Sequence, residues 1–177
     1  MLNIATSRLD VVPATPALLN AQLESRSEFA AILGARVPDD WPPGEYDRPA
    51  IEHFRSRLTE NPADADWYVW YALLRSGGSE VATVVGAGGF FGPPNAQGVV
   101  EIGYSVVSAF NGRGYATELV QALVKHAFQS GRVTRVVAHT TVDNVGSVRV
   151  LEKAGFGFVG PGHEVGTVEY ALRFPET

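Results

Sequence analysis

The stretch Asn111-Gly112-Arg113-Gly114-Tyr115-Ala116-Thr117-Glu118 follows an apolar, strand-like run and opens the longest helical pattern in the sequence. Its two glycines let the backbone approach a ligand without obstruction by Cβ atoms. The free amides of the first helical turn and the positive end of the helix dipole favour a phosphate or pyrophosphate there. We therefore predict an anion-binding loop at this point of the chain.

Two common phosphate-binding loops do not fit this stretch. A Walker loop ends in Gly-Lys-Ser/Thr, whereas Gly114 is followed by Tyr115 and Ala116. A dinucleotide-binding fingerprint needs a third small residue where Thr117 stands, and an acid closing the next strand. That strand ends Ala138-His139-Thr140 and has no acid. A simpler alternative is that the glycines only cap a helix.

The remaining pattern, Gln/Arg-x-x-Gly-x-Gly/Ala, is matched by Asn111, Gly114 and Ala116, with Asn in place of the usual Gln or Arg. This pattern resembles the acetyl-coenzyme A loop of the GNAT N-acetyltransferase superfamily. The stretches 101–106, 143–147 and 151–156 on either side of the loop resemble the branch that acetylates the N-termini of ribosomal proteins. The resemblance implies an acetyl-coenzyme A-dependent N-acetyltransferase with coenzyme A as its cofactor.

Composition favours a soluble globular protein, and we expect one GNAT-like domain over 1–177. The chain has 45% hydrophobic and 19% charged residues, which is ordinary for a globular core. No apolar run approaches the roughly 20 residues of a membrane span, and no signal peptide pattern opens the chain, so we expect a cytoplasmic protein. Cysteine is absent, which excludes disulfides, thiolate metal sites and an acyl-cysteine intermediate. The formal net charge of -5 argues against non-specific nucleic-acid binding.

Hydrophobic periodicity predicts an α+β fold. The apolar runs between 67 and 107 indicate an antiparallel meander with a turn at 76–79, and the helix over 115–129 supplies a crossover to a parallel strand at 135–138. We expect a mixed, mostly antiparallel sheet of about six or seven strands with helices on both faces. The expected strands are 8–13, 67–74, 80–89, 99–107, 135–138, 156–159 and 168–174. A first helix is expected to start at Thr15-Pro16. Further helices are expected over 28–33, 51–58 and 115–129, and from 143 or 144 to 155.

Two side-chain expectations accompany these elements. On the helix over 115–129, Glu118 is expected to be exposed, together with Gln121 and Lys125. The proline-rich segment 37–49 predicts a long loop, in which Trp41 either pins the loop to the core or, with Tyr46, lines a pocket.

One face of the strand over 99–107 carries Glu101, Gly103 and Ser105. A glycine inside a strong strand often marks a bulge or the close approach of another backbone. In the resembled superfamily this strand diverges from its neighbour, and the pantetheine arm of the cofactor lies in the gap. The resemblance implies cofactor contacts from Tyr104, Ser105, Val106, Asn111, Gly112, Arg113, Gly114, Tyr115, Ala116, Thr117, Asn144 and Ser147.

Direct acyl transfer to a primary amine needs a base for the amine and a proton for the departing thiolate. Glu101 matches the acidic position that commonly serves as base in the superfamily, although it could only form an ion pair, and Glu164 is the second candidate. Many members protonate the thiolate with a tyrosine, but Leu151 stands at that position. The resemblance implies that Ser147 takes this role and that Asn144 bonds the pantetheine arm, unless both are ordinary helix caps.

The partners and the alternative function follow from the same features. The acceptor is expected to be a protein N-terminus or a small-molecule amine, with no nucleic acid or membrane partner, and the protein a monomer or homodimer. The four histidines form no i, i+4 pair, so we expect no metal site. Because Leu151 replaces the usual tyrosine, the alternative is an acyl-coenzyme A-binding sensor without catalysis.

Overall fold

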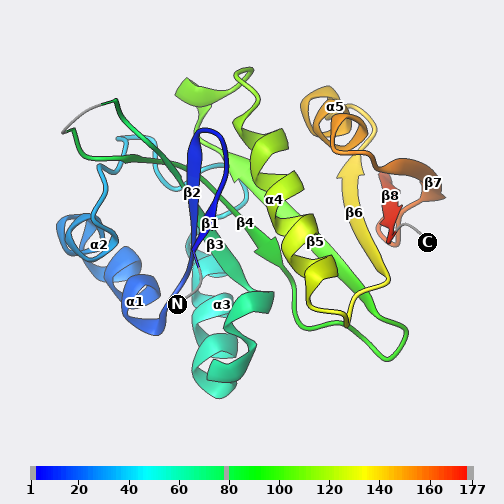
Figure 1. Ribbon diagram of the computed structural model, residues 1–177, viewed down its shortest axis with the longest axis horizontal. Coiled ribbons are helices and arrows are strands. Elements are labelled where there is room, and N and C mark those ends of the chain that lie inside the picture. Colours follow the sequence, from blue (N-terminus) through cyan, green and yellow to red (C-terminus); the bar gives the residue numbers. More distant parts are fainter. Residues whose placement is uncertain (1–2, 78–79, 175–177) are drawn as a thin grey trace.

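The computed structural model describes residues 3–77 and 80–174 and has one continuous sheet with helices on both faces (Figure 1). Two 3-10 helices, η1 (Pro62–Trp67) and η2 (Ser108–Phe110), interrupt the longer connections. The strands are β1 (Ile4–Ala5), β2 (Leu9–Pro13), β3 (Val69–Leu74), β4 (Thr83–Phe90), β5 (Val99–Val106), β6 (Arg135–Thr141), β7 (Gly157–Pro161) and β8 (Thr167–Arg173). The α-helices are α1 (Pro16–Glu24), α2 (Arg26–Leu33), α3 (Arg48–Glu60), α4 (Tyr115–Gln129) and α5 (Val145–Lys153).

The sheet confirms the predicted mixed α+β architecture. Its order is β1-β2-β3-β4-β5-β6-β8-β7, and among these described strands only β5 and β6 pair in parallel. The described residues thus form eight strands, one or two more than expected. The expectation missed β1, a strand of two residues that is too short to show an alternating pattern. The predicted turn at 76–79 includes Gly78 and Ser79, which lie outside the described residues.

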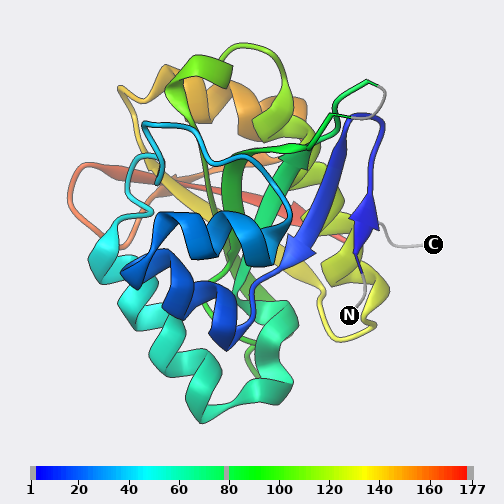
Figure 2. The same ribbon diagram turned by 90° about the vertical axis from the view of Figure 1, so that its left-hand side faces the viewer.

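Two apolar clusters fill the two sides of the sheet. The first lies under α4, whose buried residues are Leu119, Val120, Ala122, Leu123, Val124 and Ala127. The second lies under α1, α2 and α3, the blue to cyan layer toward the viewer in Figure 2. Because β3 contributes Trp70 to the first cluster and Tyr71 to the second, it is the central, doubly covered strand that its continuous apolar run indicates.

The helix ends follow the predicted capping signals, with one correction. The Thr15 hydroxyl accepts the Leu18 amide at 3.1 Å, and α2 ends at Gly34, whose φ is 67°. The expected loop over 37–49 is shorter than predicted, because α3 already begins at Arg48 with Asp47 as its cap. Pro49 therefore lies in the first helical turn, where the amides have no partner within the helix, so a proline there loses no helical hydrogen bond.

Strand β5 pairs with a different neighbour along each half of its length. Its first residues, 99–101, pair with 135–137 of β6, and the parallel ladder stops at Glu101 and Val137. Its later residues, 102–106, pair with 86–90 of β4. The remaining length of β5 and the second half of β6 therefore have no ladder between them, which confirms the predicted divergence.

The start of α4 is held by the segment that joins β1 to β2. The Glu118 carboxylate accepts hydrogen bonds from the Thr6 hydroxyl at 2.6 Å, the Ser7 hydroxyl at 3.1 Å and the Arg8 amide at 2.8 Å. The Arg8 side chain also pairs with Glu118 at 2.7 Å and donates to the Arg113 carbonyl at 2.9 Å. We call these four residues, Thr6, Ser7, Arg8 and Glu118, the Glu118 network.

The expected exposure of Glu118 is therefore wrong: its side chain is only 13% exposed. Burial alone would raise its pKa, but the hydrogen bonds from Thr6, Arg8 and Ser7 outweigh burial and lower the pKa from 4.5 to about 2. Helical periodicity places Glu118 away from the α4 core, but it carries no information on a segment 110 residues away that covers this position.

We predict that Glu118→Gln lowers the free energy of unfolding by roughly 1.5–3 kcal/mol near neutral pH, because an amide cannot accept all of these charged hydrogen bonds. A folded-state pKa below the unfolded value adds stability above about pH 4.5, and this contribution disappears as pH falls through about 2. Urea unfolding at several pH values should therefore show the wild-type advantage shrinking below about pH 4.5. The exposed Glu152→Gln is the control, and an equal loss in both variants, or a loss independent of pH, would contradict this role.

Candidate active site

A cleft of about 1290 Å³ opens where β5 and β6 diverge. It is lined by the start of α4, the first turns of α5, the loop before α3, and the β7–β8 hairpin. Every predicted cofactor-binding residue except Arg113 lines this cleft, as do both candidate bases, Glu101 and Glu164. The fold thus brings together residues that the sequence places up to 63 positions apart.

The glycine loop predicted to bind an anion lines one end of the cleft. Gly112 and Gly114 have φ angles of 73° and 83°, which L side chains rarely adopt. Gly114 is the N-cap of α4 and has no side chain to accept the first-turn amides, so these amides remain available to an anion. Arg113 lies outside the cleft lining, and its guanidinium carbon lies 5.6 Å from the centre of the Phe110 ring.

Tyr104 connects β5 to α5 across the gap. Its hydroxyl donates to the Ser147 carbonyl at 3.2 Å. Burial raises the pKa of Tyr104 to about 12, although the hydrogen bond to Ser147 opposes the shift. The phenol therefore stays protonated near neutral pH and remains a hydrogen-bond donor beside the first turn of α5.

At the first turn of α5, the structure shows which of Asn144 and Ser147 caps the helix with its side chain. Asn144 is the N-cap, and its side-chain oxygen accepts the Ser147 amide at 3.1 Å. Ser147 uses its backbone in this cap, so its hydroxyl is not the capping group. Leu151, at the position where many superfamily members carry a tyrosine, is 1% exposed and belongs to the core.

Glu101 forms a polar cluster at the point where the β5–β6 ladder ends. His139 Nδ1 donates to Glu101 Oε1 at 2.8 Å, and its Nε2 lies 3.2 Å from His163 Nδ1 and 3.4 Å from Glu169 Oε2. Glu169 also pairs with Arg135. The Glu101 side chain is 32% exposed, so it is open to the cleft while His139 fixes its orientation.

Sequence reasoning missed His139, His163 and Glu169 as members of the site. They lie on β6, in the β7–β8 hairpin and on β8, and His139 meets Glu169 only because the two strands pair in that register. A register between strands that are distant in sequence depends on tertiary packing. The one available signal was the pair of polar residues, His139 and Thr140, that ends an otherwise apolar strand.

The loop before α3 covers the opposite wall of the cleft. A Cβ atom at Gly44 would lie 2.5 Å from Ser105 Oγ, so the loop backbone comes very close to β5. Tyr46 lines the cleft, whereas Trp41 packs against Phe29 at 5.9 Å between ring centroids. Of the two roles considered for Trp41, the structure supports anchoring of the loop to the core.

Aromatic side chains complete this wall. Phe54 of α3 lies between Tyr68 and Phe91, with ring centroids 6.3 and 6.1 Å away, and all three residues line the cleft. A Cβ atom at Gly103 would lie 2.9 Å from Phe91 Cζ. The close approach that Gly103 permits in this structure is therefore that of an aromatic ring, where the sequence suggested a bulge or a second backbone.

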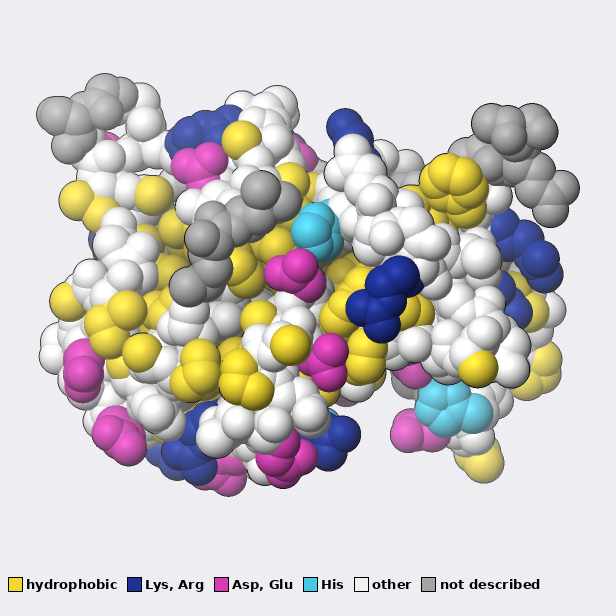
Figure 3. Space-filling model, turned by 60° about the horizontal axis from the view of Figure 1, so that its bottom comes forward, with side chains coloured by type: hydrophobic (Ala, Val, Ile, Leu, Met, Phe, Trp, Pro, Cys, Tyr) yellow, Lys and Arg dark blue, Asp and Glu magenta, His cyan; other side chains and the backbone are white. Residues whose placement is uncertain are grey.

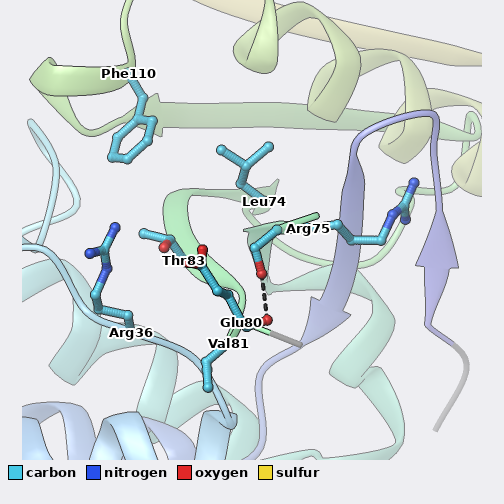
Figure 4. Close-up of a pocket in the computed structure, with 8 residues that line it drawn as sticks. Arg36, Leu74, Arg75, Glu80, Val81, Thr83 and Phe110 are labelled. Carbon is cyan, nitrogen blue, oxygen red and sulfur yellow. Dashed lines mark hydrogen bonds between the residues drawn. The ribbon is translucent and has the colours of Figure 1, made fainter. Parts of the chain in front are cut away.

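A second pocket of about 400 Å³ lies beside the β3–β4 hairpin (Figure 4). It is lined by Arg36, Leu74, Arg75, Ser76, Glu80, Val81, Thr83 and Phe110, and none of these is a predicted site residue.

On the face in Figure 3, basic and acidic side chains are interspersed and the basic ones form no continuous band. Among the described residues, no helix is long and apolar enough to cross a membrane.

Comparisons with known proteins identify the family of the chain. The family model described as "Acetyltransferase (GNAT) domain" matches residues 8–157. The uncharacterized N-acetyltransferase YjdG of Bacillus subtilis (strain 168) is 30% identical over 156 residues, which cover 88% of this chain and 90% of YjdG.

Solved structures of acetyltransferases share the fold at lower identity. RimL, a ribosomal L7/L12 alpha-N-protein acetyltransferase in complex with coenzyme A, has a TM-score of 0.64 at 21% identity, covering 97% of this chain and 98% of RimL. The ribosomal-protein-S5-alanine acetyltransferase from Vibrio fischeri has a TM-score of 0.67 at 15% identity, covering 98% of this chain and 97% of that chain. With the family model matched along most of its length, the chain belongs to the GNAT family of N-acetyltransferases.

Proposed function

We propose that the protein transfers the acetyl group of acetyl-coenzyme A to a primary amine by direct attack of the amine on the thioester. The observation that carries this proposal is the single cleft in which the glycine loop, the β5–β6 divergence and Glu101 meet. An anion-binding loop at one end and a carboxylate at the other match the two substrates of such a reaction. The RimL structure in complex with coenzyme A supports the choice of donor.

The donor site combines two features of the backbone. The first-turn amides of α4 and the helix dipole would hold the pyrophosphate, while the Glu118 network keeps that turn in place. The pantetheine arm would lie between β5 and β6, where unpaired backbone groups can accept it as an additional strand. Asn144 and Tyr104 lie beside this path.

The acceptor site lies on the face of β5 that carries Glu101. A protonated amine must lose a proton before it attacks the thioester, and Glu101 is positioned to take that proton directly or through one water molecule. His139 holds the carboxylate, and the exposed His163 next to it gives the proton an exit to solvent. The named ribosomal-protein acetyltransferases among the structural neighbours support a protein N-terminus as the acceptor, with small-molecule amines as the other class.

The departing thiolate needs a proton donor in place of the tyrosine that Leu151 replaces. Ser147 is our choice, because its hydroxyl is free of the capping role and lines the cleft. The Tyr104 phenol is the second candidate, since it stays protonated and reaches the same turn of α5. Ser147 and Tyr104 offer alternative proton donors, so the missing tyrosine no longer favours a sensor without catalysis.

The proposed activity predicts thiol release from acetyl-coenzyme A that depends on a free amine. Release would be measured with peptides that have free N-termini, with the same peptides blocked by N-acetylation, and with small polyamines. We expect release with at least one free amine and none with the blocked peptides. Absence of amine-dependent release across this panel would contradict the proposed function.

Glu101→Gln should lower turnover by about 10² to 10⁴-fold while leaving the affinity for acetyl-coenzyme A little changed, because a base acts on the amine. Glu164→Gln, in the same cleft, is the matched variant and should keep most of the activity. If Glu164→Gln causes the larger loss, Glu164 is the base. If neither variant loses turnover, neither carboxylate acts as base.

Ser147→Ala and Asn144→Ala separate catalysis from capping on one helical turn. Ser147→Ala keeps the cap, so we expect reduced turnover with an unchanged melting temperature. Asn144→Ala removes the cap, which costs about 1 kcal/mol and lowers the melting temperature by roughly 2–4 °C. Thermal melts and steady-state kinetics on the same preparations provide the test, and full turnover of Ser147→Ala would shift the donor role to Tyr104.

A further inference from the structure

Phe91 presents an aromatic ring to the cleft and not to the core. The residue follows the end of β4 and is 57% exposed, whereas the preceding Phe90 is buried against Trp67, with ring centroids 5.6 Å apart. Consecutive residues of an extended strand point to opposite faces of a sheet, so Phe91 lies on the face opposite the core under α4. A large apolar side chain that lines a cleft and stays exposed is available to contact a ligand.

The same face of the sheet carries Glu101. The Phe91 amide donates to the Glu101 carbonyl at 3.1 Å, which continues the β4–β5 ladder by one residue beyond the pair of Phe90 and Ile102. Residues that stand opposite one another in an antiparallel ladder have their side chains on the same face. The aromatic ring is therefore a neighbour of the carboxylate that we propose as the base, and both line the cleft.

Gly103 provides the space for this ring. A Cβ atom at position 103 would lie 2.9 Å from Phe91 Cζ and 3.0 Å from its Cε2, so any other residue there would displace the ring. The Phe91 ring centroid lies 6.1 Å from that of Phe54 on α3, which in turn lies 6.3 Å from that of Tyr68. We call Phe54, Tyr68 and Phe91 the aromatic wall.

The charges around the aromatic wall favour a cation and disfavour an anion. Glu45 of the loop before α3 and Glu164 of the β7–β8 hairpin line the cleft together with Glu101. The Lys and Arg residues in the described lining of the cleft, Arg149 and Lys153, both lie on α5. A positively charged amine that carries an apolar group matches these surroundings, whereas an acceptor with a carboxylate next to its amine would be repelled.

We propose that the aromatic wall selects acceptors whose amine adjoins an aromatic or large apolar side chain. This inference rests on the proposed function, since it places the amine at Glu101. With the amine beside this carboxylate, the neighbouring side chain of the acceptor covers the Phe91 ring, which removes apolar surface of both partners from water. For a peptide acceptor, the preferred first residue is phenylalanine, tryptophan or leucine, and serine or aspartate is disfavoured.

The test measures binding of peptides to protein saturated with coenzyme A, which has no acetyl group to transfer. Calorimetry would compare short peptides that differ only in their first residue, which is phenylalanine, leucine, serine or aspartate. We expect the phenylalanine peptide to bind at least about 10-fold more tightly than the serine peptide, and the aspartate peptide to bind most weakly. Because no acyl transfer takes place, this result is separate from amine-dependent thiol release, which tests the proposed function.

Phe91→Ala removes the exposed ring and should abolish most of the preference for phenylalanine over serine, while Phe91→Leu keeps an apolar contact and should retain part of it. Phe158→Ala is the matched control, because Phe158 is also exposed but lies on β7, outside the described lining of the cleft. It should bind the peptides like the wild type. Equal affinity of the wild type for the phenylalanine and serine peptides, no binding of any peptide, or an unchanged preference in Phe91→Ala would overturn the proposal.

Discussion

The site depends on the change in the pairing of β5 at Glu101, where the ladder with β6 ends and the ladder with β4 goes on. A strand in a sheet normally satisfies its backbone amides and carbonyls on both edges, because unpaired groups away from water are costly. Here the parallel ladder with β6 stops at Glu101 and Val137, while the antiparallel ladder with β4 continues to Val106. One edge of β5 is thereby left open inside the molecule. That edge is the natural position for an extended ligand with amide groups of its own.

The rest of the structure fixes what surrounds this open edge. The apolar face of α4 packs under β4 and β5, so the amino end of the helix is directed at the same gap. The Glu118 network ties that helix end to the β1–β2 segment, which explains how an exposed glycine loop can hold a defined shape. On the other side, the loop before α3 reaches β5 at Ser105 and lines the same cleft. Separate parts of the fold thus supply the two sides of the cleft.

Local signals in the sequence predicted most elements, and long-range contacts limited the rest. The helix from Tyr115 to Gln129 was predicted to the residue, because a glycine precedes it and Ser130-Gly131 ends it. By contrast, the contact between Glu101 and His139 joins residues 38 positions apart through a strand register that no local pattern encodes. The Glu118 network was missed for the same reason. The anion loop could be predicted because its chemistry lies in consecutive residues, whereas the polar cluster around His139 exists only in the folded sheet.

We propose that the open edge of β5 receives the pantetheine arm while the α4 loop holds the pyrophosphate. Hydrogen exchange measured by mass spectrometry, with and without coenzyme A, tests both parts at once because unpaired amides exchange quickly until a ligand covers them. We expect slower exchange at 102–106 of β5, 138–141 of β6 and 112–117 of the loop, with no change in the β2–β3 pair. Protection confined to the pocket around Arg36 and Arg75, or no protection at saturating coenzyme A, would contradict it.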